Sequence, residues 1–175
     1  MALVSRQPIY GAAMTVIGYE LLYDGGVGAR ELASGAAEAT LRVVADAALE
    51  IGLDRLAGGL PVYIHYPREL LTAPEPLSLH PERVIIQVIE ELPGDAQLIE
   101  ALKRLRARGH RLALDQFAPQ LNDTALLDLV DIVKIDVAHY PSEDLARWAP
   151  ALVRHGLQLI AKEVESIEQF DQCLQ

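Results

Sequence analysis

The sequence predicts an α/β fold in which helices cover a mostly parallel sheet. Five short aliphatic runs, bounded by Gly, Pro or Asp, alternate with segments whose apolar residues recur at helical spacing. Parallel strands need a crossover of a dozen or more residues, which these segments supply. The N-terminal part differs, because Ile9–Tyr10 and Val16–Leu22 are separated only by residues 11–15, which suits an antiparallel hairpin.

The five aliphatic runs predict buried strands, since they are short and rich in β-branched or aliphatic residues. In chain order they are Val62–Tyr66, Val84–Ile89, Arg111–Asp115, Ile132–Asp136 and Leu157–Ala161. An irregular loop is expected over Leu71–Pro81, which contains three prolines.

Four helices are predicted between and after these strands. The first lies over 41–51, where Leu41 and Val44 begin an apolar stripe. The second is capped by Asp95 and ends at Gly109. The third begins at Ser142 and should be bent or divided at Pro150, and the last begins over Ile167–Gln175.

Length and composition indicate a single globular domain over residues 1–175. The chain has 51% hydrophobic residues and a net charge of −10, so a phosphate backbone would be repelled and DNA is not an expected partner. One cysteine cannot form an internal disulfide. No apolar run is long enough to span a bilayer and no export signal is visible, so we expect a cytoplasmic protein without membrane attachment.

Polar and charged residues stand where the apolar runs end. Carboxyl ends of parallel strands meet at one edge of a sheet or one mouth of a barrel, where active sites lie. Burying unpaired charge is costly, so these residues point to one polar pocket. They are Glu20, His65, Gln87, Glu90, Asp115, Gln116, Lys134, Asp136, Lys162 and Glu165.

Several motifs, in this order, resemble those of the EAL domain, the bacterial cyclic-di-GMP phosphodiesterase module. They are Tyr19–Leu22, Leu114–Phe117, Val133–Asp136 and Ala161–Glu165. Ser5–Tyr10, Gly18–Leu22 and Tyr66–Leu71 are similar to the EAL half of EAL–HDOD proteins, in which the EAL domain is often degenerate. The resemblance implies a modified TIM-like barrel with an antiparallel first strand and a two-metal phosphodiesterase site.

Carried over position by position, the resemblance implies a depleted set of metal ligands. The family's first metal glutamate is Glu20, its asparagine ligand falls at His65, and a further glutamate falls at Gln87. Of the family's paired aspartates, the first is Asp115 and the second falls at Gln116. Two carboxylates therefore stand where the family supplies four.

The resemblance places the remaining site positions as follows. The catalytic lysine matches Lys134, the glutamate that helps activate water falls at Lys162, and the later glutamate of that motif is Glu165. The substrate-phosphate arginine falls at Asp24, which would repel a phosphate, and a second motif glutamate is Glu90. Because hard cations need several carboxylates, we expect no resident metal, two-metal hydrolysis or tight cyclic-di-GMP binding.

Other interpretations of single residues stay open. A register slip would offer Glu163 in place of Lys162, but neighbouring strand residues point to opposite faces, so it would need a bulge. Lys134 is either a site residue or the partner of an ion pair with Glu20 or Asp115. Asp136 is interpreted as a cap at a strand end, and His65 as a hydrogen-bonded histidine. The other histidines, His80, His110, His139 and His155, have no partner spacing and are expected at the surface.

The sequence also predicts an unfinished barrel. A TIM-type barrel usually needs roughly 250 residues, and the family's closing strands are not recognisable here. An open sheet edge exposes unpaired backbone groups, so we expect a dimer or a partner segment on the unclosed side.

The leading functional hypothesis is a catalytically degenerate EAL-like domain that acts as a regulatory protein-interaction module in bacterial signalling. Two alternatives are an active phosphodiesterase that uses Mg²⁺ or Mn²⁺, and a non-catalytic cyclic-di-GMP receptor.

Overall fold

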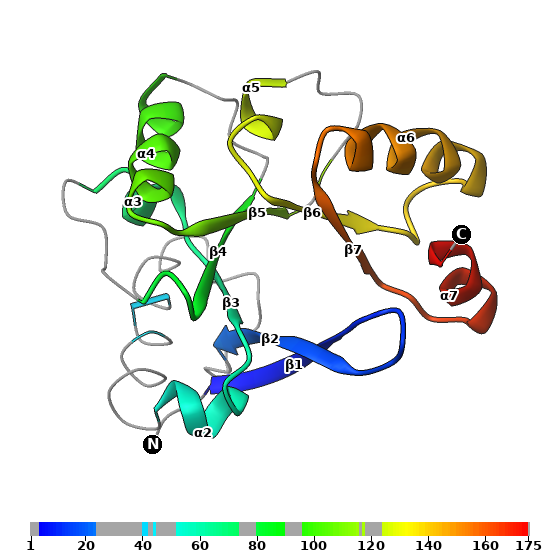
Figure 1. The fold of residues 1–175 in the computed structure, drawn as a ribbon, viewed down its shortest axis with the longest axis horizontal. Helices are drawn as coiled ribbons and strands as arrows, with labels where there is room; N and C mark the ends of the chain where they lie inside the picture. Colours follow the sequence, from blue (N-terminus) through cyan, green and yellow to red (C-terminus); the bar gives the residue numbers. More distant parts are fainter. Residues whose placement is uncertain are drawn as a thin grey trace.

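The structure, a computed structural model, describes residues 4–23, 40–41, 44, 52–73, 80–89, 96–115, 117 and 124–174. Seven strands form one sheet in chain order, from β1 to β7. The sheet curls into an incomplete barrel, and α4, α5 and α6 lie on the outer side of the curve (Figure 1). The predicted α/β barrel class is confirmed.

The first two strands form an antiparallel hairpin and all later neighbours are parallel. β1 (Val4–Tyr10) pairs antiparallel with β2 (Val16–Tyr23), as the short connection predicts. The parallel strands are β3 (Val62–His65), β4 (Val84–Ile89), β5 (Arg111–Asp115), β6 (Ile132–Asp136) and β7 (Gln158–Lys162). Predicted and observed bounds of these five strands differ by at most one residue.

The described helices α2 to α6 connect successive parallel strands, and α7 follows the last strand. Their bounds are α2 (Leu53–Ala57), α3 (Arg68–Leu71), α4 (Ala96–Ala107), α5 (Thr124–Leu127), α6 (Ser142–Arg154) and α7 (Ile167–Cys173). Among the described helices the longest, α6, has 13 residues, and none of them has the length and apolarity to cross a bilayer.

Two of the predicted helices differ from the structure or lie mostly outside its described residues. The third helix was predicted to be bent or divided at Pro150; it is not divided, because α6 runs through Pro150 as one helix. A proline removes one intrahelical hydrogen bond, but the turns on both sides can still form. Asp95 and most of the predicted helix over 41–51 lie outside the described residues, although Leu41 and Val44 are helical.

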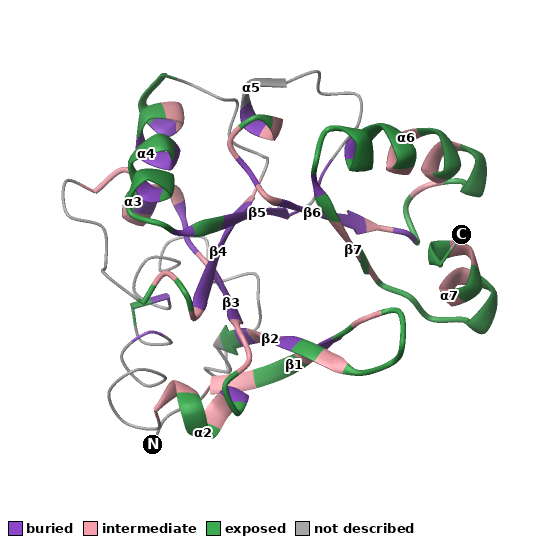
Figure 2. Cartoon of the chain, in the orientation of Figure 1, coloured by how far each residue is buried: buried purple, intermediate pink, exposed green. Residues whose placement is uncertain are grey.

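Side chains alternate between two faces of the curled sheet. The outer face carries the larger apolar core, in which Ile86 and Leu114 of the strands join Leu102 of α4. The inner face carries a smaller apolar layer of Ile9, Tyr63, Ile85, Ala113 and Ile132, against which Ile160 packs. The central strands are the most buried part of the molecule (Figure 2). Helix packing on one face therefore leaves the other face free to form the inside of the barrel.

Candidate functional site

A polar cluster lies directly beyond the inner apolar layer. Residues two positions apart on a strand share a face, so the residue two after each inner apolar residue also points inward. On β4 to β7 the inner apolar residues are Ile85, Ala113, Ile132 and Ile160. The residues two positions after them are all polar: Gln87, Asp115, Lys134 and Lys162. Hydrogen bonds and ion pairs join them to one another and to a carboxylate of β2. The polar cluster consists of Glu20, Gln87, Asp115, Lys134 and Lys162.

Lys134 is the centre of the cluster and is 1% exposed. Its ammonium lies 3.0 and 2.9 Å from the two carboxylate oxygens of Glu20 and 3.3 Å from Oδ2 of Asp115. It also donates to the side-chain oxygen of Gln87. Lys134 thus forms ion pairs with both carboxylates, the second of its two interpretations, and a site role for it stays open. These contacts satisfy a charge that would otherwise be costly to bury.

Gln87 closes a second link across the cluster. Its Nε2 donates to Oε1 of Glu20 over 2.8 Å while its Oε1 accepts from Lys134. An amide offers a donor and an acceptor at once, which a carboxylate cannot do when ionised. Glutamine at this position therefore joins Glu20 to Lys134 without adding negative charge.

Lys162 forms a second ion pair at the end of β7. Its Nζ lies 2.7 Å from Oδ1 of Asp115, and the side chains are 25% and 12% exposed. Asp115 therefore contacts the ammonium of Lys134 through one oxygen and that of Lys162 through the other. The two carboxylates of the cluster, those of Asp115 and Glu20, therefore face the two ammonium groups of Lys134 and Lys162. The formal charges of the cluster sum to zero.

The structure decides between Lys162 and Glu163. The β6–β7 register is unbroken up to Lys162, which pairs with Asp136. Glu163 follows with a φ of 55°, in the left-handed region, and is exposed. No bulge brings Glu163 inward, so the cation is the residue that enters the cluster.

The other sequence-predicted site residues lie apart from the cluster or outside the described residues. Asp136 caps its own strand end, accepting from the Ala138 N–H at 3.0 Å and pairing with His139 at 2.8 Å. Glu165 is exposed, and its backbone N–H donates to the Gln169 side chain. Asp24, Glu90 and Gln116 lie outside the described residues.

His65 lies at the end of β3, in register with Gln87. Burial lowers its pKa, the carboxylates of Asp115 and Glu20 oppose that shift, and Lys134 adds to it. The neutral imidazole is thus favoured beside the cluster, while the hydrogen bond interpreted for the His65 side chain stays a prediction.

The described residues do not fit a pair of divalent cations. Mg²⁺ and related hard cations require several oxygen ligands, commonly carboxylates. In the part of the chain that the structure describes, no group of three His, Cys, Asp or Glu side chains is placed to hold a metal ion. The carboxylates of Glu20 and Asp115 are already in contact with ammonium groups.

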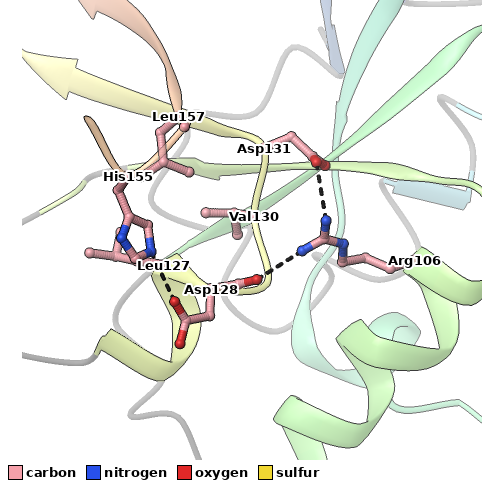
Figure 3. Close-up of a pocket in the computed structure, with 8 residues that line it drawn as sticks. Arg106, Leu127, Asp128, Val130, Asp131, His155 and Leu157 are labelled. Carbon is pink, nitrogen blue, oxygen red and sulfur yellow. Dashed lines mark hydrogen bonds and ion pairs between the residues drawn. The ribbon is translucent and has the colours of Figure 1, made fainter. Parts of the chain in front are cut away.

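A separate cavity of about 310 Å³ lies at the opposite, N-terminal ends of β6 and β7 (Figure 3). Arg106 donates to the backbone oxygen of Asp128 at 2.8 Å and pairs with Asp131 at 3.5 Å. His155 lies 2.9 Å from a carboxylate oxygen of Asp128. These contacts tie the end of α4 to the turns before β6 and β7, so we assign this cavity a structural role.

His110 corrects one expectation, because it is only 6% exposed. It shares the outer face of the chain with Leu112 and Leu114, and this two-residue spacing was the signal that could have placed it inside. Its Nδ1 is buried without a hydrogen-bond partner. Burial lowers its pKa, Arg108 lowers it further, and the Val84 carbonyl opposes the shift.

The lowered pKa predicts a loss of stability in acid. Below the unfolded-state value, about 6.5, the unfolded chain binds a proton that folded His110 resists, so stability falls as the pH falls through the folded pKa. We expect the midpoint of thermal unfolding to fall between pH 7.5 and about pH 5.5. The fall should be shallower in His110→Gln, and exposed His80→Gln is the control. Equal slopes in the two variants and the parent chain would contradict the assignment.

Two curated relatives match nearly the whole chain. Uncharacterized protein YuxH of Bacillus subtilis (strain 168) is 30% identical over 177 residues, covering 98% of this chain and 43% of that protein. Cyclic di-GMP phosphodiesterase CdgJ of Vibrio cholerae is 30% identical over 173 residues, covering 97% and 40%. The chain thus spans less than half the length of the curated relatives it matches. No family model matches it.

Solved structures share the fold. Klebsiella pneumoniae BlrP1, in a calcium and cyclic-di-GMP complex, superposes with a TM-score of 0.80 at 22% identity, covering 98% of this chain and 51% of that one. The Bacillus subtilis YkuI protein, with an EAL domain and in complex with substrate cyclic-di-GMP and calcium, gives 0.67 at 20% identity, covering 98% and 52%. The curled sheet of this chain, with its antiparallel first strand, thus has the same fold as these structures.

Proposed function

On the premise that this chain has the fold of EAL-domain proteins and resembles them in sequence, we propose that it is a catalytically degenerate EAL-type module. Its role is regulatory protein interaction in bacterial signalling, in the cytoplasm, and residues 1–175 form one such domain. The observation that carries the proposal is the pairing of Asp115 with two ammonium groups, those of Lys134 and Lys162. A carboxylate so neutralised is a poor ligand for a divalent cation.

A second candidate function has its own support. The curated relative CdgJ is named a cyclic di-GMP phosphodiesterase, and the BlrP1 structures contain cyclic-di-GMP with manganese or calcium. An active enzyme here would have to use Glu20, Asp115 and Lys134, with His65 as a further ligand, and Mg²⁺ or Mn²⁺ would displace an ammonium group. A third candidate, a receptor that binds cyclic-di-GMP without hydrolysing it, requires no metal displacement.

Hydrolysis of cyclic-di-GMP distinguishes the first two functions. The purified chain is incubated with cyclic-di-GMP and Mg²⁺ or Mn²⁺, and the linear product is measured by chromatography. We expect no turnover above that of Glu20→Gln, a variant of the same shape without the charge. Turnover that this substitution abolishes, in a variant with an unchanged circular dichroism spectrum, would overturn the proposal.

Binding and association are measured on the same preparation. Saturable heat on titration with cyclic-di-GMP, without turnover, would establish the receptor function instead. The sheet ends at β1 and β7 in the described part of the chain, so these two strands offer backbone groups for pairing. We propose that a second copy or a partner protein associates there. Sedimentation of the chain, with and without candidate partners, measures this association.

A further inference from the structure

We infer that the Lys162 ammonium takes the place of a metal cation in the polar cluster and is the group that keeps divalent cations out. The inference deepens the proposed function and rests on it. It identifies one residue of this chain, at the end of β7, as the determinant of whether the cluster is a metal site.

The first step is the geometry around Asp115. Its Oδ1 contacts Lys162 at 2.7 Å and its Oδ2 contacts Lys134 at 3.3 Å. A divalent cation that approaches either oxygen therefore meets an ammonium group already at contact distance. Binding of the metal would require one lysine to leave.

The second step compares the two lysines. Lys134 is buried and contacts both oxygens of Glu20, the amide oxygen of Gln87 and Asp115. Lys162 is 25% exposed and contacts Asp115. Removing the charge of Lys134 would leave buried carboxylates without their shared partner, whereas Lys162 lies at the rim, where water can replace it. Lys162 is therefore the cation that can be exchanged.

The third step is the chemistry of the exchanged site. A carboxylate in place of the Lys162 ammonium would be the third carboxylate of the cluster, after those of Glu20 and Asp115. All three would lie beside the amide oxygen of Gln87. The formal charge of the cluster would change from zero to −2. Oxygen donors with net negative charge are what Mn²⁺ and Mg²⁺ require.

The experiment measures metal binding directly on the full chain, without substrate. Free Mn²⁺ is followed by electron paramagnetic resonance during titration, and calorimetry gives the stoichiometry. We expect no saturable binding by the parent chain, and binding by Lys162→Glu at least about tenfold tighter than in the control variant. Lys103→Glu is that control, because it changes the net charge equally at an exposed i,i+3 pair on α4.

A second variant keeps the test valid if the first variant does not fold. Lys162→Gln removes the ammonium without adding a carboxylate, and it should bind Mn²⁺ more tightly than the parent chain but less tightly than Lys162→Glu. Thermal unfolding followed by circular dichroism shows whether each variant is folded. If Lys162→Glu does not fold, binding by Lys162→Gln that exceeds that of both the parent chain and Lys103→Glu supports the inference.

The inference is overturned if the parent chain binds Mn²⁺ as tightly as the Lys162 variants, or if neither folded Lys162 variant exceeds Lys103→Glu. These outcomes are independent of turnover. Hydrolysis by the parent chain would defeat the proposed function, whereas failure of the Lys162 variants to gain metal would defeat this inference alone.

Discussion

Replacing Lys134 by methionine is expected to lower the free energy of unfolding by about 3–5 kcal/mol. The ammonium is 1% exposed and lies between the carboxylates of Glu20 and Asp115, which are themselves mostly buried. Methionine fills a similar volume but leaves these carboxylates facing each other without the cation that they share. The cost is therefore mainly that of mostly buried negative charge that has lost its partner.

Chemical denaturation at pH 7.5 measures this effect. Lys103→Met removes a lysine that is 54% exposed and should change the free energy of unfolding by no more than about 0.5 kcal/mol. Adding Glu20→Gln to Lys134→Met should recover part of the loss, because one unpaired carboxylate is removed. A Lys134→Met variant as stable as the parent chain would show that the ion pairs of the cluster do not support the fold.

Replacing Leu102 by alanine is expected to lower the free energy of unfolding by about 2–5 kcal/mol. Leu102 is completely buried in the middle of α4 and belongs to the outer core, which also contains strand residues such as Ile86. Alanine removes apolar atoms and leaves a cavity that the surrounding side chains fill only in part. Alanine is a better helix former than leucine, so the loss cannot come from helix propensity.

The control for this effect is Val153→Ala on α6. Val153 is 57% exposed, so its truncation should change the free energy of unfolding by about 0.5 kcal/mol or less. Urea unfolding followed by circular dichroism measures both variants. A loss below about 1 kcal/mol in Leu102→Ala would mean that α4 is not packed against the sheet as the structure places it.

The sequence by itself determined the strands, their order and the end of the sheet where polar side chains gather. Aliphatic runs such as Val84–Ile89 and Ile132–Asp136 predict strands because their length and bounds suit no helix, and the structure has them with those bounds. The two-residue period also places Gln87 and Lys134 on the face opposite to their apolar neighbours. These properties are local, so a single sequence contains them.

Only the tertiary structure decided which charges meet. Lys134 and Glu20 are 114 residues apart in the chain, and Lys162 and Asp115 are 47 apart. Their contacts depend on the registers of several strand pairs, and no local pattern encodes a register. The burial of His110, by contrast, follows the two-residue spacing that it shares with Leu112 and Leu114, a local signal. The residue types near the site are thus a property of the sequence, whereas the pairing of its two carboxylates with two lysines arises only when the sheet has curled.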